Sequence, residues 1–246
     1  MSDILFFEFA IFLFSGFIHG LLGFGFPMIA TPLLSVFLSV KEAVLLTLFP
    51  TMVSNAKIIR KTGNFSGVWK EYKILIIFVV LGSFLGTNLL IEFDTPYYKL
   101  LLAVVILMYL NKKYMKISLE EIISNNPKSM MFFFGLLSGV VSGLVNIMLP
   151  ILVIYVLEMN IAKDKSFTLM NLCFLASKIT QIFIFGSHGN FSLDFTLFMI
   201  PVIIISIMGL ILGEKARRFI DENLYKKILI WLLWLLSTYL IVDTFF

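Results

Sequence analysis

The chain has 246 residues, of which 60% are hydrophobic and only 14% are charged, and its mean hydropathy is +1.01. Soluble domains hold about 45–50% apolar and about 25% charged residues, so this composition excludes an ordinary soluble protein and indicates an integral membrane protein. The net charge of +4 comes from bases in short loops between apolar segments, which argues against nucleic-acid binding. The single Cys173 excludes an intrachain disulfide and a cysteine-based metal cluster.

Apolar segments recur along the whole length and leave no stretch for a separate soluble domain. We therefore expect a single membrane domain over residues 1–246, all-α and polytopic, with no cofactor and no metal. Several segments reach the roughly 20 residues that span a bilayer. The sequence predicts ten hydrophobic segments, at about 4–20, 23–39, 42–59, 72–91, 97–111, 129–145, 147–159, 166–185, 193–213 and 225–245.

The first unusual feature is a break between the first two segments, where four glycines lie within ten residues and two prolines follow. These residues are Gly16, Gly20, Gly23, Gly25, Pro27 and Pro32. Glycine and proline interrupt a smooth helix, and a membrane tolerates such a break only where it is buried in protein or lines a cavity. A related stretch, GLLSGVVSGLVNIMLP, returns at 135–150. Paired interrupted segments are typical of a transporter's binding site, although each hairpin could span the membrane or re-enter it.

An internal duplication divides the chain into repeat one, about 1–120, and repeat two, about 129–246. Matched residues keep their order, and their offset drifts only from 119 to 127. Gly16, Gly20, Gly82, Gly86 and the tetrapeptide 63–66 return as Gly135, Gly139, Gly209, Gly213 and 189–192. Each repeat holds five segments, an odd number, so the second enters the membrane inverted. The expected fold is therefore two inverted five-segment repeats, each starting with a Gly/Pro-broken helical hairpin.

The basic residues predict the orientation. Sixteen of the 19 fall on one set of loops, while the opposite set holds only Lys41 and Lys99, and Lys178 lies inside a segment. Cytoplasmic loops carry the excess of Lys and Arg. We therefore expect a multi-pass protein of the cytoplasmic (inner) membrane with both termini outside.

Three features together resemble the TauE/SafE family of sulfite-exporter-like permeases, over nearly the whole chain. They are the glycine-rich first segment ending in Pro-Leu-Leu, the basic loop leading to Gly63-Asn64-Phe65, and the Gly-xxx-Gly of segment four. The resemblance implies movement of small anions, often sulfur-containing, such as sulfite, sulfonates or related organic acids. The chain departs from the family's glycine clusters at Gly23-Phe24-Gly25-Phe26-Pro27 and in the second half, where only Gly143 remains. These departures bear on the substrate rather than on the family.

Candidate substrate-binding residues come from the two breaks and from two apolar segments. Broken helices direct their N-termini and unpaired backbone N–H groups at an anion. The breaks contribute Gly23, Gly25, Pro27, Thr31, Ser142, Gly143, Asn146 and Pro150. Polar side chains inside segments three and eight add Asn55, Asn171, Lys178 and Gln181. The other helical glycines are expected to serve packing of the GxxxG kind, whereas Gly23 and Gly25 fit packing and substrate lining equally.

Lys178 is the most informative charge, because a cation inside the hydrocarbon costs at least about 2.5–3.5 kcal/mol and usually faces a partner or a cavity. It either coordinates an anion or snorkels to the outer interface. His19, inside the first broken segment, is a candidate for proton coupling, with a packing histidine as the alternative.

The function that we expect is secondary transport of small anions, by alternating access around a site between the broken hairpins. Without an ATP-binding motif, the driving force is an ion gradient or the substrate's own gradient. An anion channel is the alternative, and a membrane-embedded enzyme is less favoured because nucleophiles and acids are scattered. The expected partners are a small anionic substrate and the lipid bilayer, with no nucleic acid. The exact substrate, the direction, the coupling ion and a homodimer stay open.

Overall fold

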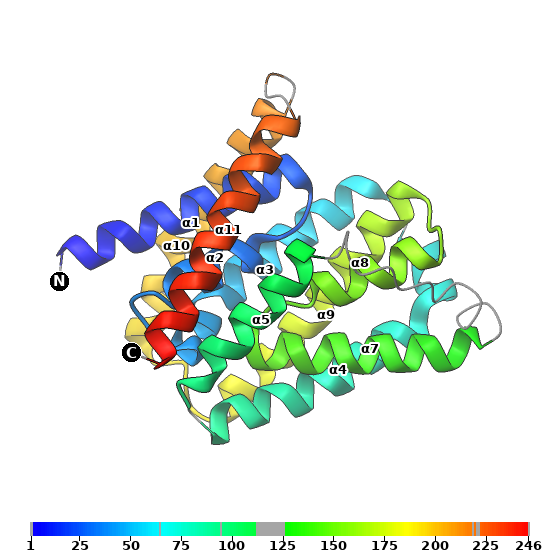
Figure 1. Cartoon of the computed structure of the whole chain (residues 1–246), viewed down its shortest axis with the longest axis horizontal. Coiled ribbons are helices and arrows are strands. Elements are labelled where there is room, and N and C mark those ends of the chain that lie inside the picture. The colour runs from blue at the N-terminus through cyan, green and yellow to red at the C-terminus, as the bar shows by residue number, and fades with distance from the viewer. Residues whose placement is uncertain are drawn as a thin grey trace.

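The computed structural model describes residues 2–63, 65–93, 95–111, 126–217, 219 and 222–245, and these residues form helices and no strand. The helices are α1 (Ser2–Leu22), α2 (Phe26–Leu34), α3 (Val40–Thr62), α4 (Phe65–Glu92), α5 (Tyr97–Asn111), α7 (Pro127–Val145), α8 (Leu149–Glu158), α9 (Lys163–Ser187), α10 (Leu193–Ala216) and α11 (Glu222–Phe245) (Figure 1). Each coincides with one of the ten predicted segments, so the predicted all-α architecture is confirmed. The end of repeat one, the basic residues predicted at 112–116 and Arg218 lie outside the described residues.

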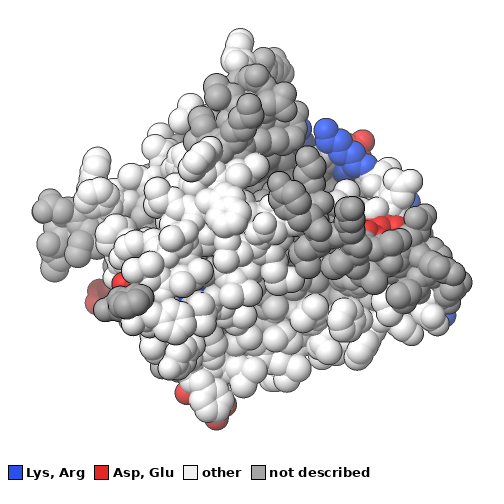
Figure 2. Space-filling view, in the orientation of Figure 1, with Lys and Arg blue, Asp and Glu red and all other residues white. Residues whose placement is uncertain are grey.

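Five helices are long and apolar enough to cross a membrane, namely α3, α4, α7, α9 and α10. Large apolar side chains point away from the protein, including Phe183, which is 74% exposed, and Trp231, which is 77% exposed. Among the residues not drawn in grey, uncharged ones cover most of the face in Figure 2, and most charged ones lie near its edges. An apolar surface of this kind suits lipid contact, and the chain is a multi-pass membrane protein.

Both predicted breaks are present, and each separates a long helix from a short one. Gly23 and Gly25, with φ of +83° and +96°, connect α1 to α2, and Asn146, with φ of +65°, follows α7. The short helices α2 and α8 have nine and ten residues. At about 1.5 Å per residue, they cover only about half of a hydrocarbon core that is about 30 Å thick. Each hairpin therefore has one arm too short to span.

Two predicted boundaries are wrong. The second segment, predicted over 23–39, is helical only over α2, because the chain turns after Leu34 and Ser39 then caps α3 through a capping box with Glu42. The fourth segment, predicted to start at residue 72, starts at Phe65. The extra turns are largely exposed and end in a kink at Tyr72, so hydropathy alone did not reveal them.

Glycines bring two helix pairs into close contact. A Cβ on Gly16 or Gly20 of α1 would lie 2.2 or 2.1 Å from the backbone oxygen of Ser206 or Leu210 in α10. The pair α4 and α7, which lie side by side in Figure 1, is packed in the same way through Gly82, Gly86, Gly135 and Gly139. The contacts advance in the same direction along both partners, so the helices of each pair run parallel. The structure thus gives these glycines the packing role that the sequence predicted.

The remaining helices surround a central pair. Helices α3 and α9 pack against each other, and α9 also packs against α4 and α3 against α10. Helix α5 packs against α11. The short helix α2 contacts α1 and α3, and α8 contacts α7 and α9. Both breaks therefore lie beside the central pair α3 and α9.

Candidate functional site

Lys178 lies in the middle part of α9, fifteen residues after the helix begins at Lys163 and nine before it ends at Ser187. Its side chain is fully buried, at 0% exposure. It forms no ion pair with a carboxylate in the part of the chain that the structure describes. Complete burial rules out the snorkelling alternative, which requires the ammonium group to reach the interface.

Two side-chain amides hold the ammonium group of Lys178. Its Nζ donates hydrogen bonds to Oδ1 of Asn146 and to Oε1 of Gln181. Gln181 lies one turn further along α9, and its Nε2 donates to the backbone oxygen of Ser142 at 2.7 Å. Asn146 caps α7 in a left-handed conformation that asparagine tolerates better than most residues. Neutral oxygens from the second break and from α9 therefore fix the position of the buried cation.

Asn146 also links the second break to the first hairpin. Its Nδ2 donates to Oγ1 of Thr31 at 2.8 Å and to Oγ1 of Thr47 at 2.6 Å. Thr31 lies in α2 and Thr47 in α3, and all three residues are fully buried. One hydrogen-bonded network therefore connects both hairpins with α3 and α9, and it contains Thr31, Ser142, Asn146, Lys178 and Gln181 from the predicted site.

The candidates Gly23, Gly25 and Pro27 belong to the first break, and Asn171 of α9 contacts that break. Asn171, two turns before Lys178 on α9, donates from Nδ2 to the backbone oxygen of Gly23 at 2.9 Å. Its buried Oδ1 has no hydrogen-bond partner among the described residues. A Cβ on Gly25 would meet no atom within 4 Å, so this glycine faces open space. Pro27 stands in the first turn of α2, where proline fits the helix start.

Of the remaining candidates, Gly143 and Pro150 have structural roles, and Asn55 has a buried amide without a hydrogen-bond partner among the described residues. Gly143 packs α7 against α4, because a Cβ there would lie 2.6 Å from the backbone nitrogen of Thr87, and it does not join the network. Pro150 starts α8 as Pro27 starts α2. Asn55 is buried in α3, and neither atom of its amide has a hydrogen-bond partner among the residues that the structure covers.

His19 has a structural contact. Its Nδ1 accepts a hydrogen bond from the backbone N–H of Phe26 at 3.2 Å. This bond satisfies one of the free N–H groups at the start of α2 and ties the short helix to α1. The buried Nε2 has no partner within the described ranges. The packing alternative for His19 therefore has a definite contact, and proton coupling stays a prediction.

Three hydroxyl-bearing residues of the site were not predicted. Thr47 contacts Asn146 directly, and Ser177 connects to Ser142 at 2.8 Å and to Ser83 at 2.9 Å between their Oγ atoms. Polar residues recur every three or four positions along α3, at Thr47, Thr51, Ser54 and Asn55, which places them on one helix face. That spacing could have identified Thr47, whereas no comparable pattern marks Ser83 or Ser177.

The arrangement favours a bound anion. Desolvating an ammonium group is costly, and amide and hydroxyl oxygens offset only part of that cost because they carry no net charge. An anion beside Lys178 Nζ would supply the missing charge. Among the described residues, no three His, Cys, Asp or Glu side chains come together as a metal site.

One comparison with known proteins finds a match. A family model described as sulfite exporter TauE/SafE matches residues 8–240, nearly the whole chain. No curated protein and no solved structure matches the chain.

Proposed function

Because this chain belongs to the sulfite exporter TauE/SafE family, we propose that it is a secondary transporter for small anions, above all sulfur-containing ones such as sulfite or a sulfonate. Membership of a transporter family supports membrane transport in general. The fully buried Lys178, held between the two broken hairpins by neutral amides, carries the proposal of an anionic substrate.

The proposed architecture is an inverted repeat that works by alternating access. Between the two repeats, α1 corresponds to α7, and α10 corresponds to α4. The pair α1 and α10 therefore corresponds to the pair α7 and α4, and both pairs are parallel and packed through matching glycines. Helices α3 and α9 exchange with each other between these pairs. Such symmetry supports two related conformations, in which one part of the bundle moves against the other around the substrate.

In this proposal the substrate binds between Asn146, Lys178 and Gln181, with Thr31, Asn55 and Asn171 around it. Lys178 attracts the anion, and the amide and hydroxyl groups are available to donate hydrogen bonds to its oxygens after local rearrangement. The complete burial of Lys178 favours a carrier with an occluded site over an open anion channel. Counter-substrate acceleration of saturable flux in proteoliposomes would distinguish the carrier from the channel.

The decisive experiment is thermal-shift screening of the purified protein with sulfite, thiosulfate, sulfoacetate, taurine and plain carboxylates. A ligand that binds only the folded state at 100 times its Kd stabilises it by about 2.7 kcal/mol. We expect sulfur oxyanions to raise the melting temperature of the wild type more than that of Lys178→Met, which keeps the side-chain volume. Lys128→Met removes an exposed charge at the start of α7 and should behave as the wild type.

Each result bears on a different part of the proposal. Equal stabilisation of Lys178→Met and wild type would remove Lys178 from the substrate site. Stabilisation by carboxylates alone would replace the sulfur-containing substrate with an organic acid. If no anion stabilises the wild type, the anion-transport proposal fails.

A further inference from the structure

A cleft of about 330 Å³ opens at one end of the bundle, apart from the buried lysine site. It lies between the C-terminal ends of α1, α3 and α10 and the N-terminal end of α9. Its lining includes Gly23, Lys61, Lys163, Phe167, Glu214 and Arg217. Lys178 is not part of the lining.

The cleft carries more positive than negative charge. Lys61, Lys163 and Arg217 line it together with the carboxylates of Asp164 and Glu214. These cations lie at the ends of three different helices, α3, α9 and α10, so their convergence is a property of the fold. A cleft lined by one excess sign of charge concentrates ions of the opposite sign.

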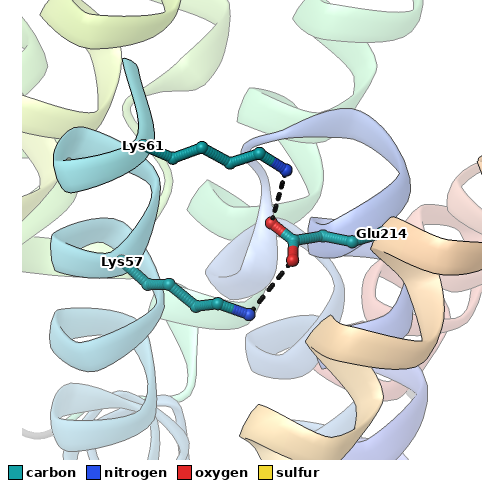
Figure 3. Close-up of polar contacts among 3 residues, drawn as sticks. All are labelled: Lys57, Lys61 and Glu214. Carbon is teal, nitrogen blue, oxygen red and sulfur yellow. Dashed lines mark hydrogen bonds and ion pairs between the residues drawn. The ribbon is translucent and has the colours of Figure 1, made fainter. Parts of the chain in front are cut away.

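Glu214 is shared between two lysines at the edge of the cleft (Figure 3). Its Oε2 lies 3.1 Å from Nζ of Lys57, and its Oε1 lies 3.2 Å from Nζ of Lys61. The Lys61 side chain is 67% exposed, against 19% for that of Glu214. An ion pair with such an exposed partner is weak, so a dissolved anion can exchange with the carboxylate at Lys61 while Lys57 retains Glu214.

One face of α9 runs from the cleft to the buried lysine. Lys163, Phe167, Asn171 and Lys178 follow at spacings of four, four and seven residues, which stack on one side of a helix. The Phe167 ring lies 3.6 Å from a Cβ built on Gly23, and Asn171 below it bonds to the backbone oxygen of that glycine. Phe167 therefore separates the cleft from the polar residues that lead to Lys178.

We propose that this cleft is a second anion-binding site, where a small sulfonate or similar oxyanion binds before it passes Phe167 toward Lys178. The carboxylate of Glu214 competes with the bound anion, because it pairs with lysines that would otherwise attract that anion. The passage to Lys178 rests on the proposed transport function, whereas binding in the cleft can be tested without transport.

The test measures how fast a cysteine placed in the cleft reacts with charged reagents. Thr62→Cys replaces a lining residue, Leu22→Cys is a second lining position in case the first reacts poorly, and Cys173 is fully buried. Ser129→Cys, exposed at the start of α7, is the reference. The reagents are anionic methanethiosulfonate ethylsulfonate and its cationic trimethylammonium counterpart. We expect the anionic-to-cationic rate ratio in the cleft to exceed that at Ser129→Cys by about tenfold or more.

Charge variants on the Thr62→Cys background identify the groups responsible. Neutralising Lys61, Lys163 and Arg217 together to Gln should reduce the ratio to that of Ser129→Cys or below it, because Asp164 and Glu214 remain. Glu214→Gln should raise the ratio several-fold, because two lysines lose their internal carboxylate. Glu71→Gln, which removes a carboxylate paired with Lys165 outside the cleft lining, should leave it unchanged. Melting temperatures of all variants confirm that they are folded.

Protection by millimolar methanesulfonate reports binding, since this sulfonate, unlike sulfite, does not cleave the disulfide that the reagent forms. Protection should be the same when Lys178→Met is added. A ratio equal to that at Ser129→Cys, or no protection at either lining cysteine, overturns the cleft site. Protection without anion transport in proteoliposomes would keep the cleft and reject the transport proposal, so the two can fail separately.

Discussion

Asn146 shows how a single residue can serve both the backbone and the site. The first break obtains its positive φ angles from Gly23 and Gly25, whereas the second uses Asn146 at +65°. Asparagine is one of the few side chains that tolerate this conformation. Unlike glycine, it brings an amide, which contacts Lys178, Thr31 and Thr47. Asn146 therefore places a polar group at the centre of the candidate site.

His19 allows a structural role and a proton-coupling role to be separated. His19→Leu removes the acceptor of the Phe26 N–H and leaves a buried donor unsatisfied, which should cost about 1–3 kcal/mol of stability. His19→Asn places an amide oxygen near the position of Nδ1 and should keep most of that stability. Melting temperatures of the purified variants measure the difference.

The same pair of variants tests proton coupling in proteoliposomes. If His19 carries a proton, His19→Asn should abolish the response of anion flux to a pH gradient while the protein stays folded. A full response in His19→Asn would leave His19 with the capping role alone. Equal melting temperatures for His19→Leu and wild type would contradict the capping role.

At the scale of helices, the close pairs α1–α10 and α4–α7 depend on the absence of a Cβ. In Gly139→Ala the new methyl group would lie 2.3 Å from the backbone oxygen of Val79, and in Gly20→Ala it would lie 2.1 Å from that of Leu210. Backbone atoms cannot rotate away, so the helices must separate, and overpacking of this kind costs about 1–3 kcal/mol. We expect both variants to melt at lower temperature than the wild type.

Gly186→Ala in α9 is the matched control, since its Cβ would meet only the ring of Phe191 at 3.3 Å. A movable side chain can yield there, and alanine is favoured over glycine in a helix by about 1 kcal/mol. Its melting temperature should therefore be unchanged or higher. If Gly20→Ala and Gly139→Ala behave like this control, the close packing of the two pairs is wrong.

Local sequence signals predicted where the helices lie better than they predicted how long the helices are. Hydropathy located all ten segments, and glycine and proline located both breaks. The short length of α2 depends on where α3 begins, which the Ser39–Glu42 capping box marks but hydropathy does not. Within the site, a buried charge and interrupted helices pointed to Lys178 and Asn146. Ser83 and Ser177 escaped because their contact joins residues 94 positions apart, and no local pattern encodes such a distance.

At the scale of the whole molecule, charge and packing give the same description of the two ends. Lys61, Lys163 and Arg217, which come from three of the loops predicted to be cytoplasmic, meet in one cleft. Lys99, predicted on the opposite side, instead pairs with Asp243 where α5 and α11 pack together. Three bases that the sequence assigns to one side therefore lie together, away from Lys99, whereas the orientation of that side in the membrane stays a prediction.

Cysteine labelling in right-side-out membrane vesicles tests that orientation directly. Ser187→Cys lies at the end of α9 opposite the cleft, and Ser129→Cys lies at the start of α7 beside Lys128, on the side rich in bases. Because loops rich in Lys and Arg remain in the cytoplasm, a membrane-impermeant maleimide should label Ser187→Cys in intact vesicles and Ser129→Cys only after permeabilisation. The parent chain, whose only cysteine is the buried Cys173, should stay unlabelled in both cases. The reverse order would place the cleft outside and make it the site where external anions first bind.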